Sequence, residues 1–314
     1  MSWLPRRLPR AAAIPLALLV NAAIAGTASA HVKWFCAFDV AGHPRSLENV
    51  LCPDFEFLVG LSMLALMGGC LIEGTALGLA MVRAIDRVTR FVRENTELMF
   101  RAGAGFFFVA IWGVGGILLT PELKTTSPWI GALHLAIAAG MLSRQTMPLS
   151  ALGIVVLFIT GILQYGAFHL ADYPVFLGVA AYLALTGAQA TLFGARPLDV
   201  VRWTAGVTLM WASVEKWAYP EWSFPLFSSH PGMAMGFDPE FFMRAAGAVE
   251  FALAFALMWT PLVRRVAAIL LAAMFISAVY EFGKVDLIGH TLIVVVLIAI
   301  IADDGKKAAA ARYP

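Results

Sequence analysis

The sequence predicts an all-α fold, a polytopic transmembrane helical bundle of about nine helices. Of its 314 residues, 61% are apolar and only 13% are charged, whereas soluble domains carry about 25% charged residues. The apolar residues form runs whose length approaches the roughly 20 residues that a helix needs to cross a bilayer. Backbone polar groups in lipid must bond within their own segment, so these runs predict helices rather than strands.

The N-terminus has the pattern of a secretory signal peptide over residues 1–30. Three arginines near the start are followed by an apolar stretch over residues 11–24 and by the small-residue cleavage pattern Ala28-Ser29-Ala30. The apolar stretch is short for a membrane span. We therefore predict cleavage after Ala30, which makes His31 the mature N-terminus. The alternative is an uncleaved first helix.

Proline and glycine residues separate the later apolar runs and mark the ends of the predicted helices. We predict helices near residues 55–82, 98–119, 129–143, 148–168, 174–193, 200–218, 241–262, 266–282 and 287–302. The predicted divisions after the signal peptide are an outer segment with the first transmembrane helix and an inner loop (31–97), a four-helix unit (98–196), and a second four-helix unit with a cytoplasmic tail (197–314).

Lysine and arginine predict the orientation, with the mature N-terminus outside and the C-terminus in the cytoplasm of a bacterial inner membrane. Segments predicted to lie inside hold thirteen of these residues and outer segments hold six, in agreement with the positive-inside rule. Arg83, Arg87, Arg90 and Arg93 are interleaved with acids, which indicates a cytoplasmic loop and no nucleic-acid surface. The histidines all fall outside or in the outer half of the bundle, which indicates chemistry there: His31, His43, His134, His169, His230 and His290.

The two predicted four-helix units form a weak internal repeat. Both units begin inside and contain an even number of helices, so they share one orientation and make a parallel repeat. The matched positions are Arg101 with Arg202, Gly105 with Gly206, and Gln164-Tyr165-Gly166 with Glu281-Phe282-Gly283.

The second unit carries the sharper motifs. Lys216 ends its first helix, and Gly247-Ala248-Val249-Glu250 lies in a later one. With these motifs the unit resembles the DoxX-like membrane family, over about a third of the chain. The first unit matches in layout only, since it has no counterpart of Glu250 in register. The resemblance implies membrane location and, for some members, partnership with sulfur or quinone redox systems such as thiosulfate:quinone oxidoreductase.

Ionisable residues of the second unit gather toward the outer side, where they predict one polar pocket. Such groups are costly in a membrane and usually face protein or water. Lys216 is the partner that the family-like pattern implies for Glu250. The pocket suits a quinone head group, a proton or a metal, and the alternative is a set of ion pairs that fix helix register. Its predicted residues are Glu215, Lys216, Glu250, Glu281, Lys284, Asp286 and His290.

Aromatic residues at the ends of the helix near 200–218, among them Trp217, are typical of an interfacial belt. Glu73 stands alone in the first mature helix among glycines, and we interpret it as a packing group satisfied by a neighbour. Cys70 is interpreted as a small buried hydrophobe.

The outer N-terminal segment offers two further sites. A free amine and imidazole at His31 can chelate copper, with His43 or another outer histidine completing the site, but we favour the alternative that His31 belongs to an amphipathic entry segment. Cys36 and Cys52 lie in the same outer segment, and an oxidising compartment favours a structural disulfide between them.

Three functions follow from these patterns. The first is a DoxX-like, redox-associated subunit linked to quinone or sulfur chemistry, with quinone as its ligand and a periplasmic or membrane redox protein as its partner. The second is a non-enzymatic module that binds copper or a periplasmic partner. The third is a small-solute transporter. The sequence has no nucleotide-binding glycine loop, no Ser-His-Asp order and no cysteine-rich cluster, which leaves the lipid bilayer as its one definite partner.

Overall fold

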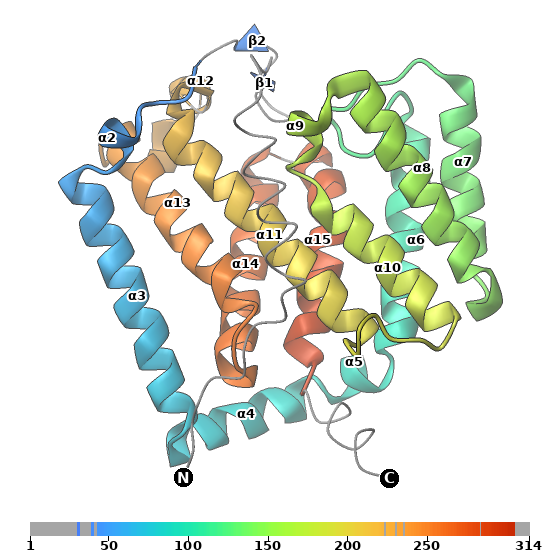
Figure 1. Ribbon diagram of the computed structural model, residues 1–314, viewed down its shortest axis with the longest axis horizontal. Helices are drawn as coiled ribbons and strands as arrows, with labels where there is room; N and C mark the ends of the chain where they lie inside the picture. The colour runs from blue at the N-terminus through green and yellow to red at the C-terminus, as the bar shows by residue number, and fades with distance from the viewer. Residues whose placement is uncertain are drawn as a thin grey trace.

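The protein is all-α in its computed structural model, which describes residues 30–31, 39–40, 43–222, 224–229, 231–234, 236–282 and 284–304. The predicted signal peptide lies outside these residues except for Ala30. Two short segments, β1 (Ala30–His31) and β2 (Asp39–Val40), pair antiparallel. The rest of the described chain is built from helices and their connections (Figure 1).

Most of the predicted helices occur near their predicted positions, with shifted ends. Thr96–Val114 and Pro174–Gly187 end earlier than predicted, the first at Gly115, whose φ of 75° favours glycine. The long helices after residue 95 are α6 (Thr96–Val114), α7 (Pro128–Gly140), α8 (Met147–Tyr165), α10 (Pro174–Gly187), α11 (Pro197–Ala218), α13 (Pro239–Ala256), α14 (Pro261–Phe282) and α15 (Lys284–Ala302).

The first mature helix differs from the prediction of one helix over residues 55–82. The chain forms α3 (Pro53–Glu73), turns, and continues as α4 (Ala76–Val88) across one end of the bundle (Figure 1). The Thr75 hydroxyl causes the break, because it accepts a hydrogen bond from the Gly78 backbone N–H at 3.2 Å and caps α4. A Cβ at Gly78 would lie 2.2 Å from the Ile72 carbonyl oxygen, so only glycine fits there.

The predicted cytoplasmic loop is also helical. Arg83 and Arg87 lie on α4, Arg90 begins the short α5 (Arg90–Glu94), and Arg93 lies on α5. The sequence favoured a loop because the charges interrupt the apolar run, but arginines three and four residues apart are also compatible with amphipathic helices.

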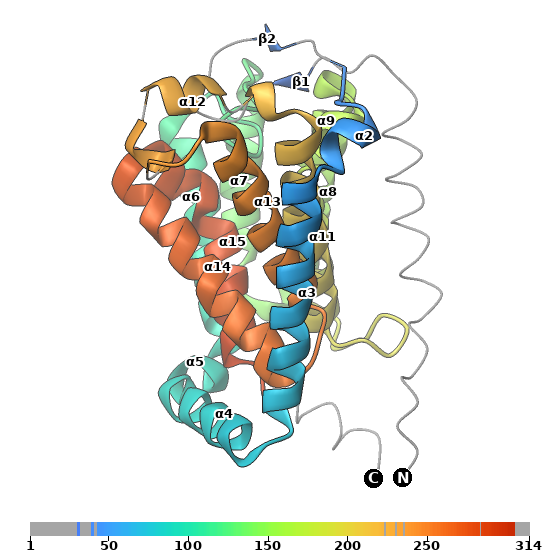
Figure 2. The same cartoon turned by 90° about the vertical axis from the view of Figure 1, so that its left-hand side faces the viewer.

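The long helices run between two ends of the bundle, which Figures 1 and 2 show from perpendicular directions. We call the end with α2 (Leu47–Val50), α9 (Ala167–Leu170) and α12 (Phe224–Ser229) the upper end, and the end with α4 the lower end. Helix α10 packs between α8 and α11, α11 packs on α13, and α15 packs on α6 and α14. Helix α3 lies outside the main bundle against α13 and α14.

Aromatic side chains form much of the buried core between α6 and α10. Phe100 stacks on Tyr182 with ring centroids 4.0 Å apart, and Phe107 lies 5.8 Å from Phe176. All four side chains are buried. These contacts hold together two helices that are far apart in the sequence.

Among the described residues, three helical segments have the length and apolar composition to cross a membrane. They are Pro53–Glu73, Thr96–Val114 and Arg144–Tyr165. Helix α3 is the clearest of them, because it has no buried residue and exposes side chains such as Phe57 and Leu71 by 70% and 74%. A run of large apolar side chains exposed in this way indicates a surface that contacts something other than water.

Buried ion pairs join the helices at the lower end. Arg264 of α14 donates to the Asp303 carboxylate at 2.7 Å, and Arg196 donates to the same group at 2.8 Å. Arg265, whose side chain is fully buried, donates to Asp86 of α4 at 2.8 Å. These pairs tie α4, α14 and the end of α15 to the start of α11.

Loss of the Asp303 charge tests how much this network stabilises the bundle. Asp303→Asn leaves Arg264 buried without its ionic partner, so we expect a loss of about 3–5 kcal/mol in the free energy of unfolding. Thermal unfolding of the purified protein in detergent measures the change. The control is Glu94→Gln, which removes an exposed pair with Arg90 and should change the melting temperature little. Equal melting temperatures for the two variants would contradict a stabilising network.

Candidate functional site

Lys216 and Glu250 form an ion pair between two neighbouring helices. Lys216 lies in the last turn of α11, Glu250 lies within α13, and Lys216 Nζ is 2.5 Å from Glu250 Oε2. Both side chains are largely shielded from solvent, with 24% and 16% exposed. The pairing that the family-like pattern implies for Glu250 is therefore present.

Gly247 explains how α11 and α13 come this close. A Cβ at this position would lie 2.4 Å from the indole Nε1 of Trp217, so a larger residue would push the helices apart. The same Nε1 donates to the Arg244 carbonyl oxygen at 3.3 Å. In the segment Gly247-Ala248-Val249-Glu250, the glycine thus admits the indole, and the glutamate one turn later reaches Lys216.

The Trp217 ring is packed on two sides. It makes an edge contact with Phe55 of α3 at 4.9 Å and lies 5.5 Å from Phe251 of α13. The prediction that Trp217 belongs to an interfacial belt is incomplete, because the ring is a packing element between α3, α11 and α13.

Arg45 covers the upper end of this region. Its backbone N–H donates to the Ala218 carbonyl oxygen at 2.8 Å, which fixes the segment before α2 over the end of α11. Its guanidinium donates to Glu240 at 2.5 Å and to Glu221 at 3.0 Å. Burial alone would lower the pKa of Arg45, but its hydrogen bonds and attraction to Glu240 and Glu221 outweigh that effect and raise the pKa.

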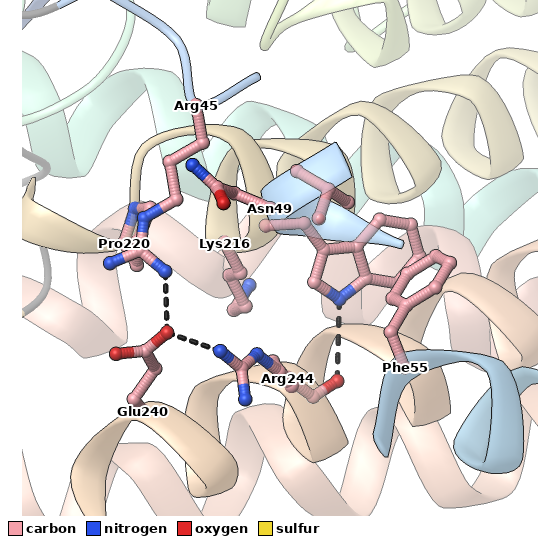
Figure 3. Close-up of a pocket in the computed structure, with 9 residues that line it drawn as sticks. Arg45, Asn49, Phe55, Lys216, Pro220, Glu240 and Arg244 are labelled. Carbon is pink, nitrogen blue, oxygen red and sulfur yellow. Dashed lines mark hydrogen bonds and ion pairs between the residues drawn. The ribbon is translucent and has the colours of Figure 1, made fainter. Parts of the chain in front are cut away.

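Glu240 is shared between two arginines. Arg244, one turn later on α13, also donates to the Glu240 carboxylate, as Figure 3 shows together with the bond from Arg45. The second guanidinium nitrogen of Arg244 lies 3.5 Å from Asp54 of α3. The cluster therefore links the start of α3, the start of α13 and the N-terminal segment.

A small hollow lies among these residues, and we call it the upper pocket. Figure 3 shows cationic side chains and aromatic rings on its walls. Lys216 connects the pocket to Glu250, because it is among the lining residues and its ammonium bonds the carboxylate. The lining residues are Arg45, Asn49, Val50, Phe55, Lys216, Trp217, Pro220, Glu240 and Arg244.

The other predicted pocket residues do not line this hollow or cannot be placed. Glu215 is buried on α11 beside Lys216 but is not among the lining residues. His290 lies on α15, where its ring packs on Phe275 at 4.6 Å, away from the pocket walls. The side chains of the remaining three lie outside the described part of the structure: Glu281, Lys284 and Asp286.

The predicted N-terminal sites remain predictions. His43 is exposed just before α2, and the side chain of His31 lies outside the described part. Among the described residues, no group of three or more His, Cys, Asp and Glu residues is placed to hold a metal ion. Cys52 precedes α3 as its N-cap residue and has no disulfide partner in the described part of the chain, while Cys36 lies outside it.

Glu73 has the neighbour that the sequence interpretation expected. The Thr260 hydroxyl, at the start of α14, donates to its carboxylate. Close helix contact is present nearby, since a Cβ at Gly69 would lie 3.3 Å from a Val263 methyl group.

Sequence reasoning missed a second polar cluster at the upper end. Glu122 of the hairpin between α6 and α7 lies 3.1 Å from His169 Nε2, and the Tyr173 hydroxyl donates to the same carboxylate oxygen. All three side chains are buried. His169 was predicted only as an outer histidine, and no spacing rule connects it with Glu122, 47 residues earlier.

Arg45, Glu240 and Arg244 were also missed as pocket residues. A local signal for two of them was available, since Glu240 and Arg244 are four apart at the start of a helix and can pair on one face. Arg45 had no such signal, because it reaches Glu240 across 195 residues.

Comparison of the chain with family models, with curated proteins and with solved structures found no match.

Replacement of Gly247 tests the packing that builds the site. Gly247→Ala places a methyl group against the Trp217 indole, so we expect a loss of about 1–3 kcal/mol in the free energy of unfolding. The matched control is Gly68→Ala on α3, where a Cβ meets nothing within 4 Å and alanine favours the helix. Thermal unfolding should therefore show a lower melting temperature for Gly247→Ala alone. A melting temperature that equals or exceeds that of Gly68→Ala would show that the indole contact is not tight.

Proposed function

We propose that the chain is a multi-pass protein of a bacterial inner membrane, with its upper end outside and its lower end in the cytoplasm. The apolar surface of α3 supports the embedding, because none of its 21 residues is buried by the protein itself. The arginines of α4 and α5 lie at the lower end together with Arg196, Arg264 and Arg265. This distribution of charge favours the lower end as the cytoplasmic one.

The finer architecture that we propose is a bundle of nine membrane-crossing helices, eight of which form two parallel four-helix repeats. Equivalent contacts of Arg101 and Arg202 support the repeat. Arg101 of α6 donates to the Met141 carbonyl oxygen at the end of α7, at 2.7 Å. Arg202 of α11 donates to the Leu257 carbonyl oxygen at the end of α13, at 2.6 Å.

The glycines one turn further along α6 and α11 extend the parallel. A Cβ at Gly105 would lie 3.9 Å from Met141, and a Cβ at Gly206 would lie 3.1 Å from the Ala254 carbonyl oxygen and 3.6 Å from Met258. Each glycine thus has a methionine near it at the end of the helix that its own unit places next. These similar contacts support the proposed repeat.

Within this framework, we propose that the upper pocket binds a quinone head group and that the chain is a redox-associated subunit, linked to quinone or sulfur chemistry. The observation that carries the proposal is the Lys216–Glu250 pair, with Lys216 exposed to the pocket beside Trp217. Quinone carbonyl oxygens accept hydrogen bonds, and Lys216, Arg45 and Arg244 supply charged donors for them. Of the DoxX-like motif residues, Lys216 lines the pocket, Glu250 is its ion-pair partner and Gly247 admits the Trp217 indole.

The free space in the upper pocket is about 10 Å³, which is room for about one water molecule. A quinone head group would therefore enter this site only as the lining side chains move apart. An isoprenoid tail would then extend into the surrounding lipid along the exposed surface of α3. Reduction of the quinone to a quinol would take two electrons from a redox partner protein and two protons from solvent.

The proposal is tested by the quinone that the protein retains after mild detergent purification, measured by mass spectrometry. The wild-type protein should carry quinone. Glu250→Gln removes the charge that holds Lys216 in place, so retention should fall about tenfold or more, since hydrogen bonds to charged groups contribute about 1.5–3 kcal/mol.

The matched control is Glu73→Gln, a helix carboxylate whose partner is Thr260 rather than a pocket residue. It should retain quinone at the wild-type level. A folded Glu250→Gln protein with undiminished quinone, or a wild-type protein that carries none, would overturn the quinone proposal. A partner protein retained in place of quinone would favour an interaction module.

A further inference from the structure

Helix α4 presents three different sides, and the first of them is bound to the bundle. It packs on α3, α14 and α15 at the lower end. Asp86 holds it there, because its carboxylate accepts hydrogen bonds from Arg265 at 2.8 Å and from Arg93 at 3.1 Å. Gly78 is buried on the same side. The rotation of α4 about its axis is therefore fixed.

The second side of α4 is an exposed apolar edge. Leu77, Met81 and Val88 are exposed by 61%, 37% and 83%. Their positions, four and seven residues apart, place them along one side of a helix. Phe91 of α5, three residues after Val88, is also exposed, by 71%. Apolar groups in a continuous row are unfavourable in water and suit the acyl-chain boundary of a bilayer.

The third side is basic. Arg83 and Arg87 are one turn apart and exposed. The acids close to them are already engaged, Asp86 with Arg265 and Arg93, and Glu94 with Arg90. Within the described part of the chain, neither Arg83 nor Arg87 forms an ion pair, so both guanidinium groups are available to an external anion.

We propose that α4 binds the head groups of anionic phospholipids in the inner leaflet. The apolar edge enters the acyl-chain boundary while Arg83 and Arg87 reach the phosphates at the level where the head groups lie. A phospholipid matches both the apolar edge and the basic side of α4, whereas a soluble anion would leave the apolar edge exposed to water. The inference rests on the proposed membrane embedding and orientation, and it does not depend on the quinone pocket.

The test compares retention of phosphatidylglycerol and of phosphatidylcholine with the same acyl chains, by native mass spectrometry of the full-length protein. The wild-type protein should prefer phosphatidylglycerol, and the preference should weaken at raised salt concentration. The double variant Arg83→Gln with Arg87→Gln should reduce that preference about tenfold or more, because each basic residue near an anionic surface contributes separately.

Arg144→Gln is the matched control, a lower-end arginine outside α4 that pairs with Glu97. It should keep the wild-type preference. Equal retention of the two lipids by the wild-type protein, or an unchanged preference in the double variant, would overturn the inference. Release of the chain from membranes by alkaline carbonate would overturn the membrane proposal itself. A wild-type protein that carries no quinone but still prefers phosphatidylglycerol would overturn only the quinone proposal.

Discussion

Removal of a charged side chain from water is so unfavourable that a buried charge must have a partner, and this constraint organises the whole bundle. Its charges lie in two layers. At the upper end Arg45 pairs with Glu240, and Lys216 in the last turn of α11 reaches Glu250 within α13. At the lower end Arg264 pairs with Asp303 and Arg265 with Asp86. Between the layers the core is mostly apolar and aromatic, with His134 buried in it.

The two layers use the same physical rule for different purposes. The lower layer joins helix ends through arginines that have carboxylates and backbone carbonyl groups as partners, which suits a structural joint. The upper layer encloses a hollow, and one of its charges, Lys216, contacts both the hollow and a shielded carboxylate. A pair in this position can respond to a ligand, whereas a pair sealed between helices cannot. This difference is the reason to place the proposed function at the upper end.

Much of this architecture could be predicted from the sequence because helix formation and apolar runs are local properties. The runs located most of the long helices, and the resemblance to the DoxX-like pattern implied the pairing of Lys216 with Glu250. The break at Gly74 was missed because an apolar run does not reveal that Thr75 caps a new helix. Arg45 and Glu122 were missed because their partners lie far away in the sequence, and a single chain carries no periodic signal for such contacts.

The central claim is that the two charged layers lie on opposite sides of a membrane. The most direct measurement is labelling of intact cells with a membrane-impermeant thiol reagent, in a chain whose three native cysteines are replaced. One variant carries a cysteine at Ser228, which is exposed on α12 at the upper end, and the other at Glu94, which is exposed on α5 at the lower end. The account predicts that the cysteine at 228 is labelled in intact cells and that the cysteine at 94 is labelled only after the membrane is opened. Labelling of both in intact cells, or the reverse pattern, would contradict it.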